Sequence, residues 1–86
     1  MYMIVVDVRE PDEYNRSHVK NALNLPLSTL YNSPEATKEL PKNEKIVVYC
    51  NSGNRSSMAA EILKHQGFTD VENGINQDHV ESALPN

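Results

Sequence analysis

The chain is built around the segment Lys45-Ile46-Val47-Val48-Tyr49-Cys50-Asn51-Ser52-Gly53-Asn54-Arg55-Ser56-Ser57. Its first five residues are an apolar, largely β-branched run of strand length. Residues 56–66 have the pattern of a helix that ends at Gly67, a glycine suited to the left-handed residue that closes helices. Cys50, the only cysteine, therefore lies where a buried strand ends, shortly before a helix begins. Open α/β folds bind ligands in the crevice at this end of their strands.

The connection between strand and helix is suited to activating a thiol. It is short and rich in small polar residues, so we expect its backbone N–H groups to turn inward. Together with the positive end of the following helix, they would lower the cysteine pKa and favour a nucleophilic thiolate. Gly53 permits backbone conformations that a Cβ would hinder, and Arg55 adds a permanent cation. A lone cysteine is more often only a small buried hydrophobe, but this context favours a catalytic Cys50.

Composition limits the classes of function. With 86 residues and 38% hydrophobic content, we expect one soluble domain over residues 1–86. A net charge of −4 argues against nucleic acid as a partner. One cysteine excludes an internal disulfide, and a free thiol suits a reducing compartment. The first residues read as a strand rather than a signal peptide, and no run has membrane-spanning length, so we expect a cytoplasmic protein without a membrane partner.

Strand-like and helix-like segments alternate along the chain, which predicts an α/β fold with a small, mostly parallel sheet of about four to five strands and helices on both faces. The other expected strands are 3–8, 22–25 and a short one around Phe68 and Val71. In the helix after the loop, Met58, Ala59, Ile62 and Leu63 share one apolar face. The expected helical segments are 11–17, one turn within 27–31, 34–40 with Ser33 as its N-cap, 54–66, and a weak helix at 77–83.

Several motifs resemble the single-domain form of the rhodanese (sulfurtransferase) family. They follow the family's order and spacing: Asp7-Val8-Arg9-Glu10-Pro11-Asp12-Glu13-Tyr14, Ser17-His18-Val19, Ala22-Leu23-Asn24-Leu25-Pro26-Leu27 and Cys50 to Ser56. The C-x-x-G-x-R-S loop after a Val-rich strand is fairly specific. The chain departs from the family at Ser17 and Asn21, and at residues 73–75, where relatives commonly have a double glycine and then an aromatic residue.

The resemblance implies a thiosulfate sulfurtransferase. The Cys50 thiolate would take the outer sulfur of thiosulfate or of a persulfide donor, and pass it to cyanide in an assay or to a thiol in a cell. Catalytic Cys50 would be served by substrate-binding residues of the loop, which are Asn51, Ser52, Gly53, Asn54, Arg55 and Ser56. No cofactor and no metal are implied. The expected partners are a small anionic sulfur donor and a thiophilic acceptor, including a protein acceptor, and the expected state is a monomer.

Several alternatives stay open on sequence grounds. Arg55 either recruits the anionic donor or tethers the loop to a carboxylate such as Asp7 or Glu13. Asp7 and Arg9 are interpreted as a structural ion pair, and the three histidines have no metal-ligand spacing. The competing functions are a non-catalytic partner-binding module and a phosphatase or arsenate reductase. The latter branch, by resemblance, needs one more residue between the cysteine and the arginine than this loop contains.

Overall fold

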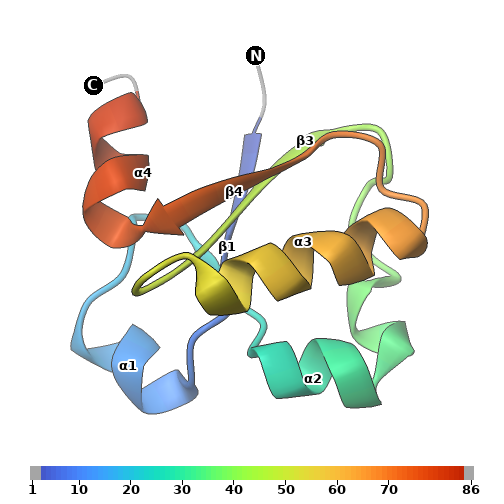
Figure 1. Cartoon of the computed structure of the whole chain (residues 1–86), viewed down its shortest axis with the longest axis horizontal. Helices are drawn as coiled ribbons and strands as arrows, with labels where there is room; N and C mark the ends of the chain where they lie inside the picture. The colour runs from blue at the N-terminus through green and yellow to red at the C-terminus, as the bar shows by residue number, and fades with distance from the viewer. Residues whose placement is uncertain (1–2, 85–86) are drawn as a thin grey trace.

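The computed structural model describes residues 3–84. Its sheet has four parallel strands in the order β2-β1-β3-β4 (Figure 1). The strands are β1 (Met3–Asp7), β2 (Leu23–Asn24), β3 (Lys45–Cys50) and β4 (Val71–Asn76). The predicted α/β fold with a mostly parallel sheet is confirmed. Because β1 and β3 are the central strands, Cys50 lies at the carboxyl end of the middle of the sheet.

Helices cover both faces of this sheet (Figure 1). They are α1 (Pro11–Arg16), α2 (Leu27–Asn32), a 3₁₀ turn η1 (Pro34–Thr37), α3 (Asn54–His65) and α4 (Gln77–Ala83). Helices α2 and α3 pack on one face, while α4 and Tyr14 of α1 pack on the other. No helix within residues 3–84 has the length and apolar character needed to cross a membrane.

The two faces divide the strand residues by the alternation of side chains along a strand. Ile4, Val6, Ile46, Val48 and Cys50 belong to the core beneath α2 and α3. Val5, Val47 and Tyr49 belong to the core beneath α4. Both faces of β1 and β3 are thus buried, which explains why these strands read as continuous apolar runs. Cys50 is placed on the α3 side, facing the helix that follows it.

The buried face of α3 differs from the prediction. Met58 was expected in the core, but it is 47% exposed. The buried residues are Ser56, Ala59, Ala60 and Leu63, which have the i, i+3, i+4, i+7 spacing of one helical face. The predicted face shares Ala59 and Leu63 with the observed one, and Ile62 is partly buried against the same core. Only Met58 is wrong, since the small residues Ser56 and Ala60 complete the buried face instead.

The segment 33–40 is also less regular than predicted. Only Pro34–Thr37 is helical, as a 3₁₀ turn, and Ser33 makes no side-chain capping hydrogen bond. The Thr37 hydroxyl bonds the Gln66 side chain at 2.6 Å, which ties this turn to the end of α3. The predicted strand 22–25 is shortened to Leu23–Asn24, because Ala22 N–H donates to the Val19 carbonyl in a preceding turn.

The last strand is longer than expected and carries an irregularity. It runs over Val71–Asn76 rather than around Phe68 and Val71, and its register against β3 shifts between Val48 and Tyr49. At the shift, Ile75 has a positive φ of 73°, which is rare for a β-branched residue. The strand leads into α4, whose predicted range 77–83 is confirmed. The bulge brings the end of β4 beside the Cys50 loop.

Candidate active site

The loop after β3 wraps around the sulfur of Cys50. Gly53 forms the N-cap of α3 and has a φ of 95°. This is the left-handed conformation, which glycine adopts without strain. The turn places the backbone nitrogen of Gly53 3.2 Å from Cys50 Sγ, and that of Ser56 3.4 Å from it. The Ser56 hydroxyl oxygen also lies 3.4 Å from the sulfur. The thiol is buried, with 1% of the residue exposed.

These contacts make the thiol acidic. Burial on its own would raise the pKa of Cys50, since it disfavours the charged form. Hydrogen bonds from the Ser56 side chain and from the N–H groups of Ser56, Gly53 and Ser52 outweigh it and lower the pKa to about 7. A substantial fraction of Cys50 is therefore thiolate at neutral pH.

The structure places the other predicted loop residues in different roles. Asn51, Ser52 and Asn54 are exposed, and the side chain of Asn51 bonds Glu13 rather than the sulfur. The expected inward turn of the loop N–H groups is found at Gly53 and Ser56, whose backbone nitrogens lie within hydrogen-bonding distance of Sγ. The Ser52 N–H also helps to lower the pKa of the thiol. Ser57 is exposed on that helix.

Arg55 is tied to α1. Its Nη1 lies 2.8 Å from Glu13 Oε1 and its Nη2 lies 3.1 Å from Oε2. Asn51 Nδ2 donates to the same carboxylate at 2.8 Å. These bonds, led by the one from Arg55, lower the pKa of Glu13 to about 2. Of the two roles left open for Arg55, the geometry shows the loop tether, with Glu13 as the carboxylate.

Asp7 has a separate partner. Arg9 binds both of its carboxylate oxygens through Nε and Nη2, the latter at 2.6 Å, and also donates to the Ser17 carbonyl. The guanidinium lies over the Tyr49 ring, 5.4 Å from its centroid. Asp7 is fully buried and Arg9 nearly so. The predicted structural ion pair between Asp7 and Arg9 is confirmed, and it fixes the connection between β1 and α1.

The histidines take no part in the thiol environment. His18 stacks on Tyr14 with ring centroids 3.7 Å apart, and its Nδ1 is 2.8 Å from the Tyr14 carbonyl oxygen. His65 and His79 are exposed on α3 and α4. Among residues 3–84, no group of three His, Cys, Asp or Glu side chains is arranged to hold a metal ion.

Asn73 of β4 is a loop contact that the sequence analysis did not single out. Its Oδ1 lies 2.6 Å from Ser56 Oγ, and its Nδ2 lies 3.1 Å from the Gly53 carbonyl oxygen. The available signal was the departure from the family at residues 73–75, where an asparagine stands in place of a glycine. Pairing with the loop depends on the bulge in β4, which a local pattern does not reveal.

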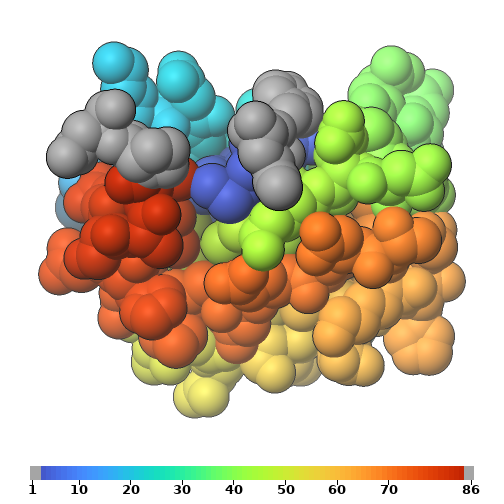
Figure 2. Space-filling view, turned by 90° about the horizontal axis from the view of Figure 1, so that it is seen from above, coloured from blue at the N-terminus to red at the C-terminus, as the bar shows by residue number. Residues whose placement is uncertain are grey.

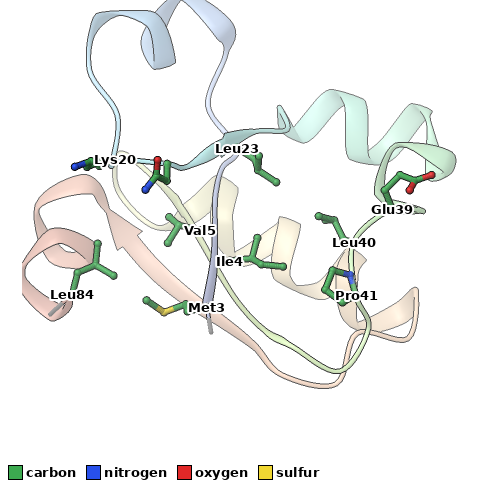
Figure 3. Close-up of a pocket in the computed structure, with 10 residues that line it drawn as sticks. Met3, Ile4, Val5, Lys20, Leu23, Glu39, Leu40, Pro41 and Leu84 are labelled. Carbon is green, nitrogen blue, oxygen red and sulfur yellow. The ribbon is translucent and has the colours of Figure 1, made fainter. Parts of the chain in front are cut away.

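The larger cavities of the molecule lie away from Cys50. One of about 390 Å³ follows the edge of β1, with Lys20 and Leu84 on one side and Glu39 to Pro41 on the other (Figure 3). Part of β1 is visible from outside beside α4 (Figure 2). A second hollow of about 500 Å³ lies between α2 and α3. Residues 50–56 line neither of them.

Comparison with known proteins gives a consistent result. The family model "Rhodanese-like domain" matches residues 2–77. The thiosulfate sulfurtransferase PspE of Escherichia coli is 44% identical over 68 residues, which cover 79% of this chain and 64% of PspE. The putative sulfur carrier protein YrkF of Bacillus subtilis is 39% identical over 71 residues, which cover 83% of this chain and 37% of YrkF. The chain thus spans less than two thirds of the length of these two relatives.

A solved structure described as a rhodanese with anions from Escherichia coli superposes with a TM-score of 0.80 at 37% identity. The superposition covers 98% of this chain and 95% of that one.

Proposed function

The chain belongs to the rhodanese-like family, and from this premise we propose that it is a sulfurtransferase that carries sulfane sulfur on Cys50. The observation that supports this most directly is the buried Cys50 thiol. Its pKa is lowered to about 7, and two N–H groups of the loop lie within hydrogen-bonding distance of its sulfur. Such a thiol is a nucleophile at neutral pH. The proposed active unit is one domain over residues 1–86.

The first half-reaction forms a persulfide. The Cys50 thiolate attacks the outer sulfur of thiosulfate, the S–S bond of the donor breaks, and sulfite leaves with the electron pair. The product is a Cys50 persulfide whose outer sulfur carries the negative charge. Donors aimed at the place where charge develops are the usual source of stabilisation in such sites. Here they are the N–H groups that already face the thiol, those of Gly53 and Ser56, together with the remaining amides of residues 51–56.

The second half-reaction returns the enzyme to its starting state. A thiophilic acceptor attacks the outer sulfur of the persulfide, and the Cys50 thiolate leaves. With cyanide as acceptor the product is thiocyanate. In a cell the proposed acceptor is a thiol, on a small molecule or on a protein. Dividing the transfer into two displacements is ordinary covalent catalysis, and the absence of a second cysteine in the chain leaves the intermediate for an outside acceptor.

The loop surrounds the Cys50 sulfur, and α1 holds the loop in place. Arg55 is bound to Glu13, so its charge is partly neutralised and its main contribution is to hold the loop. The donor anion is then recognised chiefly by the backbone amides of the loop. We also propose that the protein acts as a monomer in the cytoplasm, where a free thiol stays reduced.

The proposed function is tested by mass spectrometry. Wild-type protein incubated with thiosulfate should gain the mass of one sulfur atom, and cyanide should remove it while thiocyanate appears. Cys50→Ser should gain nothing under the same conditions. As a matched control, Ser57→Ala changes an exposed residue of the neighbouring turn and should gain sulfur as the wild type does.

The competing readings give different results in the same experiment. A partner-binding module would keep its mass in thiosulfate and in persulfide donors alike. A phosphatase would hydrolyse aryl phosphates without gaining sulfur. Either of these two results with folded wild-type protein would contradict the proposal.

The length of the loop can be tested in the same way. Insertion of one residue between Gly53 and Asn54 should widen the loop and slow sulfur uptake.

A further inference from the structure

The side chain of Asn73 is held in one orientation. Its Oδ1 lies 3.0 Å from the backbone nitrogen of Ile75, and its Nδ2 lies 3.1 Å from the carbonyl oxygen of Gly53. A backbone N–H can only donate and a carbonyl oxygen can only accept. Both contacts therefore identify the same atom of the amide as oxygen. Whatever else touches Oδ1 has to be a donor.

The Ser56 hydroxyl lies between this oxygen and Cys50. Its Oγ is 2.6 Å from Asn73 Oδ1 and 3.4 Å from Cys50 Sγ. A hydroxyl carries one proton, and the short contact with Asn73 needs that proton. In the thiol state, Ser56 then turns a lone pair toward Cys50 and accepts a hydrogen bond from the thiol S–H.

We propose that Asn73 is a positioning residue for the Cys50 nucleophile, which competes with the sulfur for the single proton of the Ser56 hydroxyl. In the thiol state the proton lies on the Asn73 side. When the sulfur becomes negative, as thiolate or as persulfide, the hydroxyl turns to it and Asn73 Oδ1 keeps only the Ile75 N–H. The hydrogen bond from Ser56 that makes Cys50 more acidic is thus gained at the expense of Asn73.

The role of Asn73 in turnover rests on the proposed function, whereas its effect on the thiol does not. The charged groups around the loop come from other elements and are unchanged by substitution of Asn73. They are Arg55 of α3, Glu13 of α1, and Asp7 and Arg9 at the end of β1. Helix α2, on the same face as Cys50, has no charged residue, and Glu72 and His79 on β4 and α4 are exposed.

The test measures thiol acidity without any sulfur donor. The alkylation rate of Cys50 by iodoacetamide is followed against pH in folded wild-type protein and in Asn73→Ala. Removing the competing acceptor frees the hydroxyl for the thiolate, so the inflection of Asn73→Ala should lie about one pH unit below that of wild type, the size expected for one charge-assisted hydrogen bond. Asn73→Leu, which keeps the branched shape of the side chain but accepts no hydrogen bond, should show the same fall if the alanine variant unfolds.

A double substitution separates this role from loose packing. Ser56→Ala removes the hydroxyl proton for which Cys50 and Asn73 compete. In this background, Asn73→Ala should not change the pH at which the alkylation rate has its inflection. An inflection that is unchanged or higher in folded Asn73→Ala and Asn73→Leu would overturn the proposal, as would an equal fall with and without Ser56. Alkylation of Cys50 needs no sulfur transfer. A wild-type protein that never gains sulfur would therefore contradict the proposed function without affecting the alkylation result for Asn73.

Discussion

At the scale of single residues, the carboxylate of Glu13 organises the loop. It accepts from Arg55 through both guanidinium Nη atoms, from Asn51, and from the Glu10 N–H of its own capping box. A carboxylate with this many donors is strongly favoured in its charged form. The side chain of Arg55 is 34% exposed, so it is sufficiently enclosed to keep one orientation toward Glu13. A bidentate arginine–carboxylate pair adds orientation as well as energy, so the loop inherits its position from α1.

This pair predicts a stability cost for Arg55→Ala. The substitution leaves Glu13 without its main partner, and we expect a loss of about 1–2 kcal/mol in the free energy of unfolding. The matched control is Arg16→Ala, which breaks the exposed pair of Arg16 with Asp12 on the same helix and should cost less than about 0.5 kcal/mol. Urea unfolding at pH 7 measures both. Equal losses would mean that the Glu13 pair does not tether the loop.

At the scale of elements, the site depends on how closely α4 and β3 approach β4. Gly74 is the residue at this contact. A Cβ built on it would lie 2.6 Å from Val80 Cγ2 and 2.7 Å from Val47 Cγ1. The absence of a side chain thus lets α4 cover the sheet directly after the strand that carries Asn73. The positive φ of Ile75 is tolerated at the same bulge because Asn73 Oδ1 binds its N–H.

Gly74→Ala should therefore destabilise the fold by about 2 kcal/mol, the range for overpacking a buried site. Thermal unfolding followed by circular dichroism would show the fall in Tm. Ser57→Ala, on the exposed side of α3, serves as the control and should change stability by less than about 0.5 kcal/mol. If Gly74→Ala had the same Tm as the control, the packing of α4 against β3 would be looser than the structure shows.

At the scale of the whole molecule, the Glu13 pair ties stability to pH. The pKa of Glu13 falls from 4.5 to about 2 on folding. A depressed carboxylate pKa means that the unfolded chain binds protons more readily, so stability is lost as pH falls. The contribution is fully present above about pH 4.5 and disappears toward pH 2.

The free energy of unfolding should therefore drop between pH 4.5 and pH 2 more steeply in wild type than in Glu13→Gln, which has no proton to bind there. The two proteins should differ most near neutral pH, with wild type the more stable. Guanidinium unfolding at a series of pH values gives both slopes. Parallel slopes would contradict the link between folding and the Glu13 carboxylate.

The sequence by itself determined the α/β class and the place of Cys50. Continuous apolar runs at residues 3–8 and 45–49 indicate buried strands, and Gly67 marks the end of the helix that follows the Cys50 loop, because these signals are local in the backbone. The motif match with the rhodanese family is local in the same sense. It identified the loop and its family, and it left the partner of Arg55 open.

Only the tertiary structure decided which residues surround the thiol and how. Glu13 rather than Asp7 holds Arg55, Asn73 reaches Ser56 through a bulge in β4, and small residues rather than Met58 face the sheet from α3. Each of these depends on the distance between two elements far apart in sequence. A local pattern fixes the direction in which a side chain points relative to its own helix or strand, whereas its partner is set by how closely those elements pack.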